Sequence, residues 1–209
     1  MKTTGANAMM QTKLSMQAKL SFSSGRDYCA QLASFIGETQ ITTQEGNVLE
    51  FNPAVSWVVA KVQATRQNQK KIMIIGNGGS AAIATHLQND LCKVLKIRAQ
   101  AFYDTALYSA IANDEGVEAV FEHPIQLFAE SGDSLFAISS SGRSQNILRA
   151  AQQARQKNCS IVTLSGFKPD NPLRKMGDIN FYVPTQHYGM VELAHQVLVH
   201  CFTDLAMIL

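Results

Sequence analysis

The segment from Ile72 to His86 carries the clearest chemical signal in this chain. Four apolar residues, Ile72–Ile75, lead into the glycine-rich turn Gly76–Ser80, and small residues follow. This pattern predicts a buried strand that delivers backbone N–H groups and a hydroxyl to a helix N-terminus. Such a place is suited to an anion, and we expect a phosphate. The turn lacks the Gly-Lys-Ser/Thr of a Walker loop and the spacing of a dinucleotide fingerprint.

A second loop of the same kind follows the apolar run Leu135–Ile138. It reads SSSGRS over Ser139–Ser144 and precedes another helical pattern. Hydroxyls beside a helix N-terminus are poor core residues and good neutral donors for phosphate oxygens. One glycine-rich turn is structural about as often as functional, whereas two such loops in one small domain predict one phosphorylated ligand. Arg143 either reaches the phosphate or lies in solvent.

Titratable residues occur on the helical segments near these loops. His86 and Asp90 are spaced i, i+4 after the first loop, so they share a helix face near the anion site. Glu192, His195 and His200 interrupt an apolar C-terminal segment. Eight residues advance a helix by about 80°, so Glu192 and His200 can lean toward one side. Such polar groups need a partner or a pocket, and His195 either supports His200 or packs at a subunit boundary.

The elements that must position these residues alternate along the chain. Strands are predicted at 72–75, 97–102, 134–138, 160–164 and 179–183, and helices at 26–36, 54–64, 81–94, 108–113, 117–129, 144–157 and 191–208. The alternation predicts an α/β fold with a parallel sheet and helices on both faces. Ligands of such sheets gather beyond the carboxyl ends of the strands, where both loops fall.

Length and composition narrow the function classes. With 209 residues, the chain is expected to form a single domain over 25–209 after a loosely ordered segment 1–24. Charged residues make up 16%, below the roughly 25% typical of soluble domains, which predicts that a homo-oligomer buries part of the surface. The formal net charge is +2 without a basic stripe, so nucleic acid is not an expected ligand.

Cysteine usage and hydropathy predict the compartment. Four single cysteines occur without a CxxC pair, which favours reduced thiols in a cytoplasmic protein. Polar residues interrupt positions 1–20, so a signal-peptide core is not expected. The chain also lacks a continuous apolar run of about 18 residues, so no membrane span is expected.

The two loops, Ala112-Asn113-Asp114 and the final helix together resemble the sugar isomerase (SIS) domain, and within it the phosphoheptose isomerases. The resemblance covers roughly residues 50–209. It implies a three-layer flavodoxin-like fold with a five-stranded parallel sheet, and a homotetramer with active sites between subunits. The implied reaction converts sedoheptulose 7-phosphate into D-glycero-D-manno-heptose 7-phosphate, a precursor for lipopolysaccharide or capsule.

The same resemblance assigns roles to individual residues. It implies one Zn²⁺ per subunit held by His86, Asp90, Glu192 and His200, where the family pattern reads His, Glu, Gln, His. Asp90 inherits the role of proton-transfer base and His200 that of its acid partner. Asp90 is one methylene shorter than glutamate, and a misplacement of about 1 Å can cost on the order of 10²-fold in rate. The predicted substrate-binding residues are Asn77, Gly78, Gly79, Ser80, Asp104, Ser139, Ser140, Ser141, Ser144 and Glu192.

A second function class fits the same loops. A non-catalytic SIS domain can sense a sugar phosphate or bind a protein partner, as does the regulator that binds the bacterial replication initiator. Such members keep the phosphate loops and lose the catalytic acids. This chain has carboxylates at both changed positions, Asp90 and Glu192, which favours an enzyme.

Overall fold

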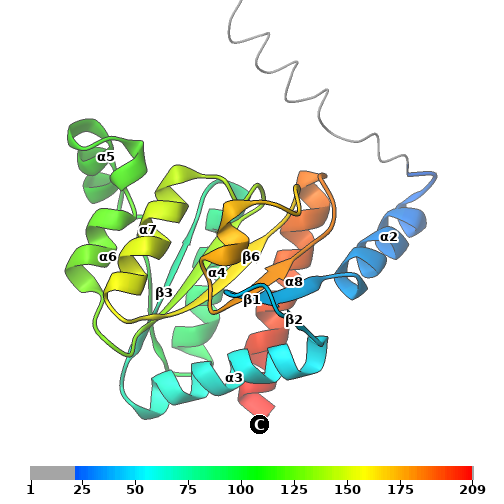
Figure 1. Ribbon diagram of the computed structural model, residues 1–209, viewed down its shortest axis with the longest axis horizontal. Coiled ribbons are helices and arrows are strands. Elements are labelled where there is room, and N and C mark those ends of the chain that lie inside the picture. Colours follow the sequence, from blue (N-terminus) through cyan, green and yellow to red (C-terminus); the bar gives the residue numbers. More distant parts are fainter. Residues whose placement is uncertain (1–21, 209) are drawn as a thin grey trace, which may run out of the picture.

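A single mixed sheet lies between two layers of helices in the computed structural model, which describes residues 22–208 (Figure 1). The strands are β1 (Gln40–Thr43), β2 (Val48–Leu49), β3 (Lys71–Gly76), β4 (Arg98–Ala101), β5 (Ser134–Ser139), β6 (Ser160–Ser165) and β7 (Ile179–Tyr182). The helices are α2 (Gly25–Gly37), α3 (Phe51–Gln67), α4 (Gly79–Lys93), α5 (Thr105–Asp114), α6 (Glu122–Phe128), α7 (Gln145–Gln156) and α8 (Tyr188–Ile208), with short 3₁₀ turns η1 (Val117–Ala119) and η2 (Pro172–Lys175).

The strand order is β2-β1-β7-β6-β5-β3-β4. The five strands from β7 to β4 are parallel, as predicted. Two antiparallel strands, β1 and β2, extend the sheet beyond β7, which makes the prediction of five strands too low. Their sequences, QITT and VL, are short and bury one large apolar side chain, Ile41. Two residues of apolar alternation are too few to indicate a strand.

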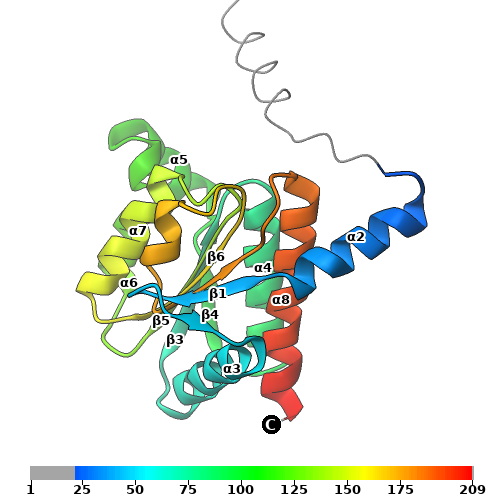
Figure 2. The ribbon, with the colours of Figure 1, turned by 45° about the vertical axis from the view of Figure 1, so that its right-hand side comes forward.

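The parallel strands alternate between two hydrophobic cores. Ile72 and Ile74 of β3 face the core under α3, α4 and α8, whereas Met73 and Ile75 face the core under α5, α6 and α7. Figures 1 and 2 show these two groups of helices on opposite faces of the sheet. Because side chains in a strand alternate with period two, a strand covered on both faces reads as a continuous apolar run.

One predicted helix is divided in the structure. The expected helix at 117–129 is two pieces, η1 and α6. Pro124 lies in the first turn of α6, where its missing N–H costs little, whereas inside a longer helix it would break a hydrogen bond. Residues 1–21 of the predicted loose segment lie outside the described residues. Ser24, at its end, caps α2 by accepting a 3.1 Å hydrogen bond from the Asp27 N–H.

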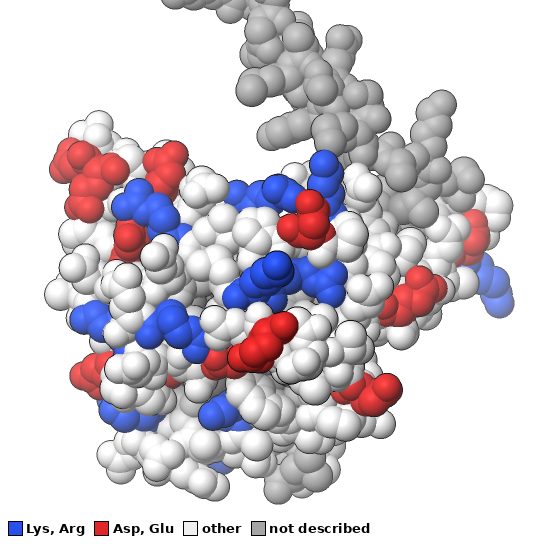
Figure 3. All heavy atoms as spheres, in the orientation of Figure 1, with Lys and Arg blue, Asp and Glu red and all other residues white. Residues whose placement is uncertain are grey.

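Helix α2 leads away from the body of the domain (Figure 2) and buries none of its residues. On the face drawn in Figure 3, acidic and basic side chains are interspersed rather than gathered by sign. Among the described residues, several acidic and basic side chains pair, as Arg155 does with Asp178 at 2.5 Å and Arg149 with Glu122. These pairs balance charge locally.

Helix α8 is the single described helix whose length and composition would allow it to cross a membrane, with a mean hydropathy of 1.2 over an 18-residue window. Of that window, 39% is buried inside the domain, where α8 packs in the core shared with α3 and α4. Its buried residues are Met190, Val191, Ala194, His195, Leu198, Val199, Phe202, Thr203 and Ala206. We interpret α8 as a core helix.

Candidate functional site

The first glycine-rich loop joins β3 to α4 at the carboxyl edge of the sheet. Gly76 ends the strand, and a Cβ there would overlap the backbone and side chain of Ser80. Gly78 has φ +56°, a conformation that glycine adopts readily. The N–H groups of Gly78 and Gly79 donate to no other described residue. The loop therefore presents free donors at a helix N-terminus, where partial positive charge favours an anion.

Two polar contacts fix this loop, and neither was predicted from the sequence. The Tyr103 hydroxyl donates to the Gly76 carbonyl at 2.8 Å, and its burial raises the Tyr103 pKa. The amides of Asn77 and Asn146 exchange two hydrogen bonds of 2.9 Å. Because Asn146 is the second residue of α7, immediately after the second loop, this amide pair joins the two loops. The N-cap of α7 is Ser144, so the asparagine preference for N-cap positions does not indicate Asn146.

The second loop connects β5 to α7 and is held by its own hydroxyls. Ser139 Oγ accepts from the Gly142 N–H at 3.2 Å and lies 3.5 Å from Ser144 Oγ. Gly142 has φ +61°, and a Cβ there would overlap the Asn171 amide. β3 and β5 are neighbours, with Gly76 opposite Ile138, so this loop lies beside the first.

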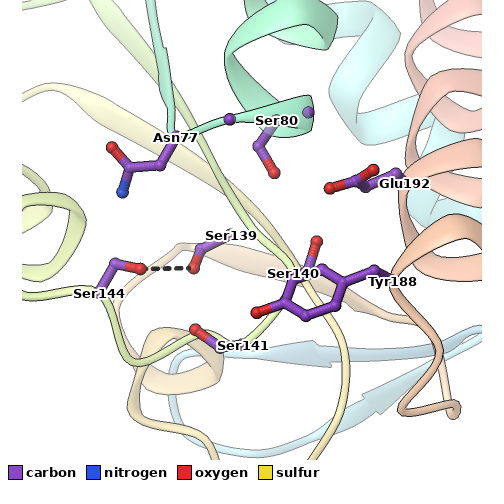
Figure 4. A pocket seen from close by; sticks show the side chains of 10 residues that line it. Asn77, Ser80, Ser139, Ser140, Ser141, Ser144, Tyr188 and Glu192 are labelled. Carbon is purple, nitrogen blue, oxygen red and sulfur yellow. Dashed lines mark hydrogen bonds between the residues drawn. The ribbon is translucent and has the colours of Figure 1, made fainter. Parts of the chain in front are cut away.

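The two loops enclose one cavity of about 240 Å³ (Figure 4). Ser140 is 5% exposed, and its Oγ has no hydrogen-bond partner among the described residues. A buried hydroxyl without a partner is costly, so it indicates a donor reserved for a ligand. Nine predicted residues line the cavity together with Tyr188, which the sequence did not indicate: Asn77, Gly78, Gly79, Ser80, Ser139, Ser140, Ser141, Ser144 and Glu192.

Glu192 reaches the cavity from α8. Its carboxyl lies against Gly79, where a Cβ would overlap it. Figure 4 shows the side chain pointing into the cavity toward Ser80. Burial raises the Glu192 pKa, as expected for a half-buried carboxylate. A carboxylate thus stands at the N-terminus of α4, the same position that an anionic ligand would occupy.

Three of the four predicted metal ligands come together outside this cavity. One donor atom each from His86, Asp90 and His200 lies within 4.8 Å of the other two. Asp90 Oδ2 is 3.4 Å from His86 Nε2 and 3.6 Å from His200 Nδ1. These separations exceed ordinary hydrogen-bond lengths and are close to the roughly 3.3 Å between neighbouring ligands of a tetrahedral zinc ion. Glu192 is not in this group.

The group fits a divalent metal with an open position. Two imidazole nitrogens and one carboxylate oxygen make a three-ligand set of the kind that Zn²⁺ has at catalytic sites. His86 and Asp90 come from one face of α4, as their spacing predicts, and His200 comes from α8. The rings of His86 and His200 meet edge to face, with centroids 4.9 Å apart.

Three other residues lie elsewhere. Asp104 caps α5, accepting a 2.9 Å bond from the Leu107 N–H, and lines a separate cavity of about 60 Å³. Arg143 donates to Asp170 at 3.0 Å, with its side chain 49% exposed. His195 is fully buried, with Nε2 3.1 Å from the Ser165 carbonyl. The contact that fixes His195 is therefore with the end of β6 rather than with His200.

Comparison with known proteins agrees with this geometry. The sequence model of the SIS domain matches residues 50–166, which contain both loops, His86 and Asp90. The chain belongs to the SIS domain family. It is 34% identical to a phosphoheptose isomerase of Helicobacter hepaticus over 164 residues, which are 76% of this chain and 83% of the relative. The corresponding protein of Nitratiruptor is 35% identical over 66% of this chain and 77% of its own length.

Solved structures show the same fold. The phosphoheptose isomerase of Neisseria gonorrhoeae superposes on this SIS domain with a TM-score of 0.75 and 25% identity, covering 86% of this chain and 95% of that one. The phosphoheptose isomerase of Francisella tularensis gives a TM-score of 0.74 at 22% identity, covering 98% and 97%. The chain is thus a SIS domain protein that resembles phosphoheptose isomerases over most of its length.

Proposed function

We propose that this protein is a sugar-phosphate aldose–ketose isomerase that converts sedoheptulose 7-phosphate into D-glycero-D-manno-heptose 7-phosphate. The observation that carries the proposal is the pairing of two parts. The first is a cradle of neutral donors formed by the loops Gly76–Ser80 and Ser139–Ser144. The second is a separate His–Asp–His group, in which His86 and Asp90 come from α4 and His200 comes from α8. The cradle holds the phosphate. The group acts on the other end of the sugar.

The spacing of these two parts suits a long sugar. His86 follows Ser80 by six residues, which is about 9 Å along a helix. The carbonyl carbon of an extended seven-carbon sugar lies roughly 8–9 Å from its terminal phosphate, given bond lengths of about 1.5 Å. A triose phosphate is too short to bridge the cradle and the His–Asp–His group. The relatives named phosphoheptose isomerase support the same choice of substrate.

Isomerisation moves one proton between adjacent carbons. The Asp90 carboxylate takes the proton from the carbon beside the carbonyl, an enediol forms, and the same carboxylate returns the proton to the former carbonyl carbon. His200, 3.6 Å from Asp90, donates a proton to the carbonyl oxygen and later recovers one from the neighbouring hydroxyl. A Zn²⁺ held by His86, Asp90 and His200 would supply Lewis-acid polarisation of the sugar oxygens when bound.

Asp90→Asn tests the assignment. The amide has nearly the same shape and cannot act as a base, so we expect turnover of sedoheptulose 7-phosphate to fall by at least about 10³-fold. In EDTA, where neither protein holds a metal, the melting temperature should stay near that of the wild type, and the sugar phosphate should still raise it, because the cradle is untouched. Normal turnover would show that Asp90 is not the base. Stabilisation by sugar phosphate without turnover in the wild type would favour the non-catalytic sensor.

The proposal includes a homotetramer with active sites between subunits, in the cytoplasm. Two observations support assembly: α2 has no buried residue, and α8 exposes Leu193 and Val197 by 40% and 43%. The group around His86, whose side chain is 49% exposed, stands open on one chain, where a neighbouring subunit can cover it. Sedimentation of the full chain measures the mass of the assembly, and a monomer would contradict this part.

A further inference from the structure

A second cavity, of about 280 Å³, lies at the amino edge of the sheet, opposite the cradle. Two neighbouring connections form it, the one that leads from α3 into β3 and the one that leads from α4 into β4. Four of its six lining residues are basic, and none of these described residues is acidic: Arg66, Gln69, Lys70, Lys96, Ile97 and Arg98. In charge, this cavity is the reverse of the cradle, whose lining has one acidic residue and no basic one.

Most of this positive charge has no partner. None of the ion pairs among the described residues involves Arg66, Lys96 or Arg98, and all three side chains belong to exposed residues. Lys70 Nζ lies 3.9 Å from Glu130 Oε2. The C-terminal ends of α3 and α4 each contribute about half a negative charge, so a surplus of about two positive charges remains even when Glu130 is counted in full. The cavity is therefore suited to an anion that brings several negative charges.

Both connections also place a long side chain where helices commonly end in glycine. Gln69 follows α3 with φ +54°, and Lys96 follows α4 with φ +57°. The Ile97 N–H donates back to the Leu91 carbonyl at 2.9 Å, which closes a helix ending that favours glycine at the position before Ile97. Strained residues of this kind gather where proteins bind ligands. The Lys96 side chain is thus present at a cost to the backbone, and a role in binding accounts for that cost.

We propose that this cavity is a second anion site, which binds the phosphate chain of a small diphosphate or triphosphate. The inference does not depend on the proposed isomerase activity. Lys71 of β3 stands opposite Arg98 of β4, and neighbouring strands are about 4.8 Å apart, so the two connections lie side by side. A chain of phosphates has more charge and a longer reach than a single phosphate, so it can contact cations of both connections at once. Arginine, present twice in the lining, binds phosphate oxygens two at a time.

The lining favours the phosphate chain itself over a nucleobase. None of the described residues that line the cavity is aromatic, and its one apolar residue, Ile97, is 4% exposed. A nucleobase therefore has no ring on which to stack. We expect inorganic tripolyphosphate and ATP to bind with similar affinity.

The site is separate from the parts proposed to bind and convert the sugar phosphate. Helix α4 has 15 residues, so its C-terminal end lies about 20 Å from its N-terminal end at the cradle. The lining shares no residue with the cradle or with the group of His86, Asp90 and His200. Substitutions in the second cavity are therefore expected to leave those parts intact.

Calorimetry on the full chain tests the proposal with tripolyphosphate, ATP and inorganic phosphate as probes. We expect tripolyphosphate to bind the wild type at least about tenfold more tightly than inorganic phosphate, and Lys96→Gln to weaken tripolyphosphate about tenfold. Lys175→Gln removes the same charge from an exposed position outside the cavity, and it is the matched control that should bind as the wild type does. Excess glucitol 6-phosphate, a sugar-alcohol phosphate that cannot be isomerised, should leave tripolyphosphate binding unchanged.

Lys96→Gly separates binding from structure. Glycine adopts the positive φ of this position readily, so the melting temperature should not fall, whereas tripolyphosphate should bind as weakly as it does to Lys96→Gln. Wild-type affinity in Lys96→Gly, equal weakening in Lys175→Gln, or no binding of tripolyphosphate to the wild type would overturn the site. Displacement of tripolyphosphate by glucitol 6-phosphate would place it in the cradle and overturn the site as well. Much tighter binding of ATP than of tripolyphosphate would overturn the assigned ligand class.

Discussion

The buried imidazole of His195 makes the stability of this fold sensitive to acid. His195 is 0% exposed, Nε2 contacts the Ser165 carbonyl at 3.1 Å, and Nδ1 has no partner among the described residues. Burial lowers the His195 pKa from 6.5 to about 4, because the charged form is poorly solvated there. The unfolded chain has the ordinary pKa, so the two states bind protons over different pH ranges.

The direction and size of the effect follow from this difference. Between pH 6.5 and about 4, the unfolded chain binds a proton that the folded chain does not, so the free energy of unfolding falls as the pH falls. Each pH unit in that window is worth about 1.4 kcal/mol. The loss from this one group is therefore about 2 kcal/mol at pH 5 relative to pH 7.5, and stability is complete above pH 6.5.

Urea unfolding measures this pH-dependent loss in the free energy of unfolding, for the wild type and His195→Gln at pH 7.5 and pH 5. The protein concentration is kept constant because assembly also affects stability. Glutamine can still donate to the Ser165 carbonyl but has no charge to gain. We expect the variant to lose about 2 kcal/mol less than the wild type between the two pH values. Equal losses in the two proteins would refute the reasoning, because they would show that His195 does not titrate differently on folding.

Three further outcomes are expected. Gly79→Ala places a Cβ on the Glu192 carboxyl, so it should abolish the rise in melting temperature that sugar phosphate causes. Adding Glu192→Ala should restore part of that rise. Wild-type binding by Gly79→Ala would contradict the close approach between Gly79 and the Glu192 carboxyl. Asn146→Ala leaves the Asn77 amide unpaired, and we expect a loss of about 1–3 kcal/mol in the free energy of unfolding together with weaker phosphate binding. An unchanged dissociation constant for phosphate would show that the amide pair does not organise the two loops. EDTA should lower the melting temperature of the wild type, because a bound metal stabilises the folded state. It should leave the melting temperature of His86→Ala unchanged, because that variant lacks one metal ligand. Equal shifts in the two proteins would argue against a metal site at His86, Asp90 and His200.

Local sequence signals predicted most of what positions the cradle. Runs such as Ile72–Ile75 indicated the parallel strands because both faces of those strands are buried. Gly76–Ser80 and Ser139–Ser144 were recognisable as anion loops because their residue types are unfavourable in a core. The two loops meet because the strands that carry them are neighbours and parallel, which is the arrangement that the alternation of strands and helices predicts.

The features that were missed depend on contacts between distant segments. β1 and β2 have too few apolar residues to indicate strands, and their place at the edge of the sheet is decided by pairing with β7. Asn77 and Asn146 are 69 residues apart, so neither amide indicates the other. Tyr188 lines the cavity because α8 begins beside the two loops. The residue pattern of α8 alone does not indicate where that helix begins in space.

The cavity between the two loops is lined by one acidic side chain, Glu192, and by no basic one among the described residues. None of the ten described residues that line the cavity is Lys or Arg, so the donors that the cavity offers to an anion are hydroxyls, backbone N–H groups and the α4 N-terminus. Such donors bind through geometry, and each contributes on the order of 1 kcal/mol. A basic side chain would bind any phosphate strongly and would neutralise Glu192. With only neutral donors, the binding of an anion in this cavity depends on how closely its oxygens match the positions of those donors.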